Sequence, residues 1–283
     1  MTRTTANNTQ YTRFYSPEEY LAYLSTLNGA YTNTYNSSFF GGSWDSALST
    51  LKTGTTKYVP DAQAIVNKMA DEQLFSVSVQ TLERSVVGFM EDHIAVATGQ
   101  PYEMYNLVND TQESLLSPIS IYIETLISAG LSHDQCVKRG VAVMALALAL
   151  NNIRPVELYT VCISKPSGSR HNAGIVCQIP TKPLDLERAA FMLCDTAYAR
   201  RLAFQAMADH ANMGHNSCVD PWAFGGDPTT KGYEENMRKA LGLEPHDIFL
   251  HGGYSLDTLM LNDPVQWVKT MLAKHRGEDV NAS

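Results

Sequence analysis

The feature that most limits the fold is an alternation of apolar runs between residues 118 and 179. Two short runs lie on either side of one longer run. Residues 119–123 and 156–163 are short and rich in β-branched side chains, which indicates buried strands. Between them, Ser132 can cap a helix over residues 135–151. Residues 174–179 predict a further strand. A strand, a crossover helix and a strand make a βαβ unit, whose two strands run parallel.

Helices are predicted on both sides of this unit. Ser16 and Ser43 each precede a helical pattern as capping residues, and Gly29 and Gly54 end those patterns. Further helices are predicted from Pro60 to about residue 74 and over the ranges 185–209, 234–241 and 263–275. Residues 247–250 and 75–79 predict strands. Residues 82–108 are ambiguous, and short helices over 91–97 and 102–108 are one interpretation of them.

The expected fold class is therefore mixed α/β, a central sheet with a βαβ unit at about residues 118–163, flanked by helices. Residues 1–15 are polar and are predicted to be a flexible arm. A single domain is expected over residues 16–283. It divides into a helical N-terminal part to about residue 110, a core over 115–210, and a C-terminal part over 211–283 that begins with a loop at 214–233.

No apolar run reaches the roughly 18 residues that a membrane span needs, and the longest is residues 140–150. The first ten residues are polar, unlike a signal peptide. The five cysteines are an odd number and widely spaced, which does not indicate a disulfide framework. We therefore expect a cytoplasmic protein with no membrane partner.

Sequence motifs for catalysis are absent. The chain has no phosphate loop of the GxxxxGK[ST] type, no GxGxxG and no GxSxG. His251-Gly252-Gly253 is similar to the oxyanion stretch of esterases, but without a nucleophile motif it is interpreted as a turn. The expectation is a protein that is not an enzyme and needs no cofactor.

A metal site is the remaining chemical hypothesis. His210, His215 and Cys218 lie close in sequence, with Cys194 upstream. Their spacing matches no standard zinc module, so we interpret them as a polar turn and predict no metal. An enzyme with an unrecognised site at these residues stays open as a third hypothesis.

The charge of the chain is unevenly distributed. The formal net charge is −8, which taken alone argues against binding to nucleic acid. Residues 61–130 hold ten acidic and two basic residues, whereas residues 131–210 hold nine basic and six acidic ones. A basic face on an acidic protein is therefore compatible with the sequence, although uneven surface charge alone would explain the same numbers.

Three groups of residues are candidates for contact with single-stranded DNA, in which cations meet phosphates and aromatic rings stack on bases. The first interleaves aromatic and basic residues in the N-terminal third, the second is a loop between two predicted strands, and the third is a pair on the long helix. Two adjacent helical residues point about 100° apart, so at most one of that pair faces a given ligand. The candidates are Arg3, Tyr11, Arg13, Tyr15, Lys52, Lys57; Lys165, Arg170, His171; and Arg200, Arg201.

The motif Phe40-Gly41-Gly42-Ser43-Trp44-Asp45-Ser46-Ala47-Leu48, with Gly54 after it, resembles the first of several sequence blocks in a group of phage and mobile-element proteins. The second motif is Val86-Val87-Gly88, followed by Thr98-Gly99-Gln100-Pro101-Tyr102-Glu103-Met104. The later ones are Pro155-Val156-Glu157-Leu158, Leu184-Asp185-Leu186 and Arg200-Arg201-Leu202-Ala203-Phe204. Within that group, the chain resembles the single-stranded-DNA-binding RNA polymerase cofactors of lytic podoviruses.

This resemblance implies a DNA-binding transcription factor without catalysis. It would hold melted middle-promoter DNA in the host cytoplasm and recruit the phage-encoded RNA polymerase, and self-association on DNA is left open. It supplies no DNA-contacting residues, so the candidates above rest on charge and aromatic character. The acidic segment 61–130 is a hypothesis for the polymerase-facing surface.

An alternative is a protein-interaction module that partners an ATPase. The βαβ unit is similar to the core of von Willebrand A domains, which bind a divalent ion through Asp-x-Ser-x-Ser after the first strand. The corresponding stretch here is Glu124-Thr125-Leu126-Ile127-Ser128. It lacks those oxygen ligands, so a module of this kind would have no metal site.

Overall fold

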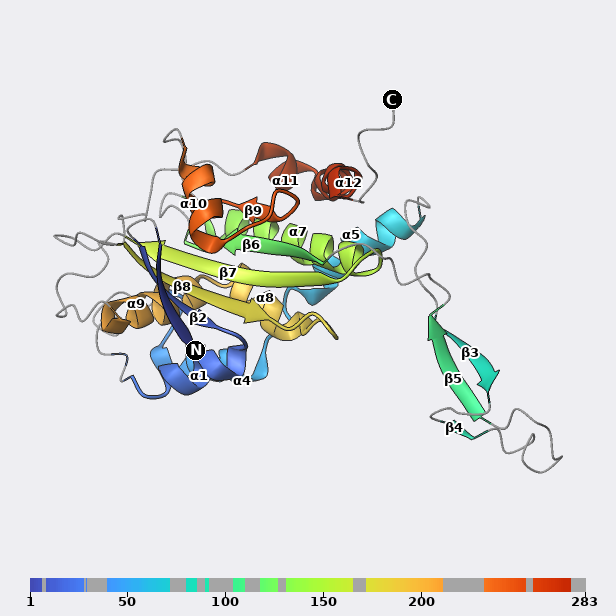
Figure 1. Cartoon of the computed structure of the whole chain (residues 1–283), viewed down its shortest axis with the longest axis horizontal. Coiled ribbons are helices and arrows are strands. Elements are labelled where there is room, and N and C mark those ends of the chain that lie inside the picture. The colour runs from blue at the N-terminus through green and yellow to red at the C-terminus, as the bar shows by residue number, and fades with distance from the viewer. Residues whose placement is uncertain are drawn as a thin grey trace.

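A six-stranded mixed sheet forms the centre of the molecule (Figure 1). The computed structural model describes residues 1–6, 9–27, 29, 40–71, 80–85, 90–91, 104–109, 118–126, 131–164, 172–210, 232–252 and 257–275. The strands lie in the order β1 (Thr2–Ala6), β2 (Thr9–Phe14), β8 (Asn172–Ile179), β7 (Val156–Ser164), β6 (Ile119–Glu124) and β9 (Ile248–Leu250). The mixed α/β class expected from the sequence is confirmed.

The βαβ unit is present as predicted. Strand β6 pairs in parallel with β7, with Ile121 opposite Leu158, and α7 (His133–Asn151) connects them. The Ser132 side chain accepts a hydrogen bond from the Gln135 N–H, and the Gln135 side chain accepts one from the Ser132 N–H, which together make a capping box. Because β9 also runs parallel to β6, the carboxyl ends of β6, β7 and β9 lie at one edge of the sheet.

The N-terminal residues, predicted to be a flexible arm, instead form β1 and β2. Strand β2 pairs in parallel with β8 and antiparallel with β1, so it is an interior strand. Its residues alternate between the two faces, and both Tyr11 and Phe14 are buried. The segment is polar but rich in β-branched Thr, which suits a hairpin whose outer strand, β1, lies at the edge of the sheet.

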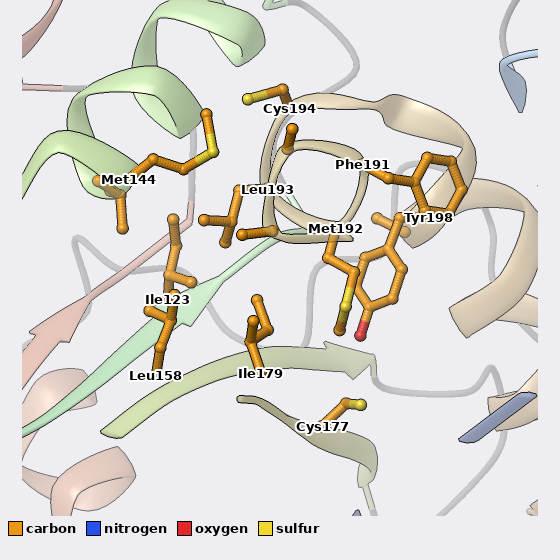
Figure 2. Close-up of a cluster of buried hydrophobic side chains, with 14 of the residues drawn as sticks. Ile123, Met144, Leu158, Cys177, Ile179, Phe191, Met192, Leu193, Cys194 and Tyr198 are labelled. Carbon is orange, nitrogen blue, oxygen red and sulfur yellow. The ribbon is translucent and has the colours of Figure 1, made fainter. Parts of the chain in front are cut away.

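One face of the sheet carries most of the helices and the main hydrophobic core. In Figure 2, side chains of the strands (Ile123, Leu158, Ile179) lie beneath Met144 of α7 and Leu193 of α8. The helices of this layer are α1 (Pro17–Leu24), α4 (Trp44–Thr53), α5 (Val59–Asp71), α7, α8 (Leu186–Cys194), the π-helix η1 (Tyr198–Ala203), α9 (Phe204–His210), α11 (Thr258–Asn262) and α12 (Pro264–His275). Among the helices of the described part, none combines the length and apolarity that crossing a bilayer requires.

The helix boundaries confirm the predicted caps at Ser16 and Ser43, whose side chains accept hydrogen bonds from the N–H groups of Glu19 and Ser46. The helix predicted over residues 185–209 is broken. Asp195 has extended backbone at the end of α8, and the chain then re-enters a π-helix. The break matters because the turn at Asp195 opens onto the candidate site.

On the opposite face, the one helix in the described part that packs against the sheet is α10 (Tyr233–Leu241). Its Met237 and Leu241 side chains cover a small second core that includes Tyr122 and Tyr159. Those two rings stack at 4.5 Å between centroids with an interplanar angle of 13°. A nine-residue helix covers only part of such a face, so Glu157 and Gln178 stay partly exposed.

A separate three-stranded sheet is inserted between α5 and β6, in the order β3 (Gln80–Ser85), β5 (Met104–Asn109), β4 (Met90–Glu91). Figure 1 shows it standing apart from the six-stranded sheet. The helical interpretation of the ambiguous residues 102–108 is therefore wrong, because most of that range is strand β5. The predicted strand over 75–79 lies outside the described residues, as does most of the predicted helix over 91–97 and of the loop over 214–233.

Candidate functional site

The candidate DNA-contacting residues are spread over several surfaces. Arg3 and Tyr15 are exposed beside the edge of the sheet, where the Tyr15 hydroxyl shares a 3.0 Å hydrogen bond with the Thr2 hydroxyl. Lys52 is exposed on the last turn of α4. Lys165, Arg170 and His171 lie outside the described residues.

Two candidates are buried and therefore do not present a surface to DNA. Tyr11 is 3% exposed, and its hydroxyl donates to the Met237 Sδ at 3.9 Å under α10. Arg201 is 2% exposed. Its guanidinium lies 4.9 Å from the centroid of the Phe40 ring and donates to the Gly42 carbonyl. Arg201 therefore fixes the loop that precedes α4.

Arg13 is half-buried on the face covered by α10. Its guanidinium lies 5.6 Å from the centroid of the Tyr159 ring and 5.9 Å from that of Tyr122. It also donates to the Leu241 carbonyl at 3.4 Å. These contacts tie α10 to the sheet, so Arg13 has a structural explanation.

Lys57 and Arg200, by contrast, come together in an open cleft of about 510 Å³. Lys57 precedes α5, and Arg200 lies in η1 after the break at Asp195. We name this the basic cleft, and its lining residues are Gly41, Lys57, Tyr58, His133, Asp195, Thr196 and Arg200. As expected for adjacent helical residues, Arg200 faces the cleft while Arg201 points into the core.

Close packing of the loop before α4 gives the basic cleft its shape. Gly41 has φ +75°, and a Cβ there would lie 2.7 Å from the Ala197 backbone nitrogen. Only glycine fits both the left-handed backbone and this approach. The Phe40-Gly41-Gly42 motif and the Arg200-Arg201 motif, distant in sequence, therefore meet at this place, with Arg201 and Ala197 as the points of contact.

The cations of the basic cleft remain charged at neutral pH. Hydrogen bonding with the Tyr58 side chain raises the pKa of Lys57, and the Lys57 Nζ lies 4.8 Å from the Tyr58 ring centroid. Burial lowers the pKa of Arg200, but a guanidinium starts so high that it keeps its proton. The Asp195 carboxylate accepts a hydrogen bond from the Ala197 N–H at 2.9 Å, which directs part of its charge to the helix start.

Two helices begin at the basic cleft. Tyr58 directly precedes α5, and His133 is the first residue of α7, with its Nε2 atom 3.4 Å from the Tyr58 hydroxyl oxygen. A helix start carries partial positive charge. The arrangement, with an exposed ammonium, a guanidinium and two helix starts, suits an anion.

His133 and Asp195 were missed as site residues at the sequence level. His133 lies between the predicted cap at Ser132 and the helix predicted from residue 135, and Asp195 falls inside a predicted continuous helix. No sequence signal places residues 57, 133 and 200 together, since that depends on how α5, α7 and η1 pack around one another. The break at Asp195 is the local feature that brings η1 into position.

The hypothesis of a zinc site receives no support from its one fully described residue. Cys194 is buried beside Gly140, and burial raises the pKa of its thiol, which disfavours the thiolate that zinc binds. His215 and Cys218 lie outside the described residues. Within the described ranges, no three His, Cys, Asp or Glu side chains form a group able to hold a metal ion.

The carboxyl end of β6, where a von Willebrand A domain would hold its metal, is occupied by Glu124. This side chain is 3% exposed. One carboxylate oxygen accepts from the Gly252 N–H at 2.7 Å, and the other accepts from the Tyr233 hydroxyl at 2.8 Å. Burial raises the pKa of Glu124, while these hydrogen bonds and nearby Arg139 oppose the rise. Glu124 therefore serves to connect β6, α10 and the segment after β9.

Comparison with known proteins gives one match. No curated protein and no solved structure matches the chain. One family model, described as a domain of unknown function (DUF7192), matches residues 3–273. This range contains the six-stranded sheet apart from Thr2 of β1, and every residue of the basic cleft. The chain therefore belongs to the DUF7192 family.

Proposed function

We propose that this chain binds single-stranded DNA and that the basic cleft takes a phosphate of the DNA backbone. The observation that carries the proposal is the meeting of Lys57 and Arg200, both candidates from the sequence, in one open cleft. Ammonium and guanidinium groups are the side chains that most often contact nucleic-acid phosphates. The starts of α5 and α7 add partial positive charge at the same place.

The geometry favours a single strand over a duplex. The cleft of about 510 Å³ is small, and its side chains supply few cations in a chain of net charge −8. A flexible single strand can bend to place one phosphate at such a small site, whereas a duplex is stiff on this length scale. Tyr15, which is 51% exposed, and Arg3 are candidates for further contact by stacking and charge.

The biological setting that we propose rests on the resemblance to RNA polymerase cofactors of lytic podoviruses. In that setting the chain holds melted promoter DNA in the host cytoplasm and recruits the phage-encoded RNA polymerase. The excess of acidic residues over 61–130 suits a face that meets a protein instead of DNA. Co-purification of the polymerase with the chain, with and without single-stranded DNA, tests this step.

A gel-shift assay with one oligonucleotide, offered single-stranded and as duplex at two salt concentrations, tests the DNA proposal. We expect the single strand to bind more tightly and its affinity to fall as salt rises, because binding releases counterions from phosphates. Equal binding of both forms, or none of either, would contradict it. Capture of an ATPase by a chain without DNA affinity would favour the von Willebrand A-like alternative.

A further inference from the structure

A second cavity, of about 300 Å³, lies beside β9, the edge strand of the sheet. We name it the β9 cavity. Figure 1 shows β9 close to α10 and α11. Together with α12, these two helices provide most of the other residues that line the β9 cavity. Trp267 and Met260 are buried and Met271 half-buried, and together they form an apolar wall. This volume is at the lower end of small-molecule sites, which combine an apolar lining with a few polar groups.

The carboxylates at the β9 cavity are already engaged by donors of the protein. The two oxygens of Asp247 accept from the Ser120 N–H at 2.8 Å and the Glu244 N–H at 2.9 Å. Asp257 accepts from the Leu259 N–H at 2.8 Å, which caps α11. The third carboxylate, that of Glu234 on α10, forms an ion pair with the Arg238 guanidinium. These acids hold the walls in place, and a bound cation would have to displace those donors.

The two cations Arg139 and Lys274 of the β9 cavity do not form ion pairs with these carboxylates. The buried Arg139 guanidinium donates to the main-chain carbonyls of Glu124, Leu250 and His251 at 2.9–3.1 Å, so its hydrogen bonds go to neutral groups. Among the described residues, no carboxylate lies within 4.0 Å of the exposed Lys274 Nζ. The lining holds as many carboxylates as strong bases, so the cavity has no net excess of charge, but Lys274 is its exposed cation without a carboxylate nearby among the described residues.

His275, which follows Lys274 at the end of α12, also lines the β9 cavity. Burial and then the charge of Lys274 lower the pKa of the His275 imidazole to about 4, and Arg154 and Arg238 act in the same direction. The contact with the His246 backbone opposes the change. With its pKa lowered by burial and by these cations, the half-buried imidazole is neutral at neutral pH, and an anion beside it would restore part of its basicity.

We propose that the β9 cavity binds a small organic carboxylate. The apolar body of this ligand lies against Trp267 and Met260, and its carboxylate faces Lys274 and His275. A single exposed ammonium beside a neutral imidazole suits one negative charge on a small head group, and the apolar wall requires a carbon skeleton. This site is separate from the basic cleft, and it does not depend on the proposed DNA binding.

Hexanoate and hexanamide are matched probes, since they share an alkyl chain and differ in charge. Titration of the full chain is followed by NMR at the Trp267 indole N–H and the His275 imidazole, the latter assigned with the His275→Gln variant. We expect hexanoate to bind about tenfold more tightly than hexanamide and to raise the pKa of His275. Lys274→Gln should weaken hexanoate about two- to fivefold, as expected for one exposed charge.

Lys239→Gln is the control, because Lys239 is exposed on α10 and does not line the β9 cavity. It should leave the affinity unchanged. Equal affinity for the two probes, an unchanged His275 signal at saturating hexanoate, or equal effects of Lys239→Gln and Lys274→Gln would overturn the proposal. Inorganic phosphate at the same concentrations separates a general anion effect from the expected need for a carbon skeleton.

Discussion

The basic cleft and the β9 cavity both gather positive side chains, but they hold them in different ways. At the β9 cavity, Arg139 donates its hydrogen bonds to main-chain carbonyls at the ends of β6 and β9 and just after β9. At the basic cleft, Lys57 and His133 are exposed at the starts of two helices. A basic side chain whose hydrogen bonds all go to main-chain carbonyls holds the fold together. A basic side chain that is exposed at a helix start can instead meet a ligand.

The largest expected effect comes from removing Arg139. Arg139→Met should lower the free energy of unfolding by about 3–5 kcal/mol, because it leaves three carbonyls without their donor and Glu124 buried without a nearby positive charge. Denaturant unfolding measures the change. The neighbouring Lys138→Met is the control, since Lys138 forms only an exposed pair with Asp134 and should cost less than about 1 kcal/mol. Equal costs would show that Arg139 is not a structural anchor.

The loop at the basic cleft offers a smaller, paired test. Gly41 and Gly42 both have positive φ, but a Cβ on Gly41 would clash with Ala197 whereas one on Gly42 has open space within 4 Å. Gly42→Ala should cost about 1–2 kcal/mol for its backbone. Gly41→Ala should cost about 1–3 kcal/mol more, because Ala197 must move. Similar midpoints in thermal unfolding would mean that the loop does not dock on η1 as described.

The smallest effect concerns pH. His275 has a pKa near 4 in the folded chain against about 6.5 when unperturbed, so the unfolded chain binds protons more readily. Stability from this group is therefore complete above about pH 6.5 and is lost as the pH falls towards 4. We expect a loss of about 1 kcal/mol, reduced by the partial exposure of the ring. His275→Gln should remove this loss, and His246→Gln should not; identical pH curves for all three chains would contradict the assignment.

Much of the fold was predictable because its signals are local. The cap at Ser132, the apolar helix after it and the β-branched runs on either side were sufficient to define β6, α7 and β7. The N-terminal strands were missed because their order depends on a distant partner, β8, to which β2 pairs. The break at Asp195 was missed because residues 186–210 contain no Gly or Pro, the residues that mark helix ends in a sequence.

The candidate site was predictable only in part, because the type of a residue can be read from the sequence but its burial cannot. Charge and aromatic character selected Lys57 and Arg200, but they also selected Tyr11 and Arg201, which the fold buries. Whether a cation near an aromatic residue faces water depends on the layer above it. For Arg201 that layer is Phe40 and the Gly42 carbonyl, and sequence spacing does not reveal it.

The most direct test of the central claim is the salt dependence of single-stranded DNA affinity for the wild type, Lys57→Gln and Lys68→Gln. Lys68 is exposed on the last turn of α5 and does not line the basic cleft, so it is a matched control. We predict that Lys57→Gln weakens binding about fivefold and reduces the magnitude of the slope of log affinity against log salt by about 0.7, the value for one phosphate contact. Identical slopes and affinities for both variants and the wild type would contradict the account.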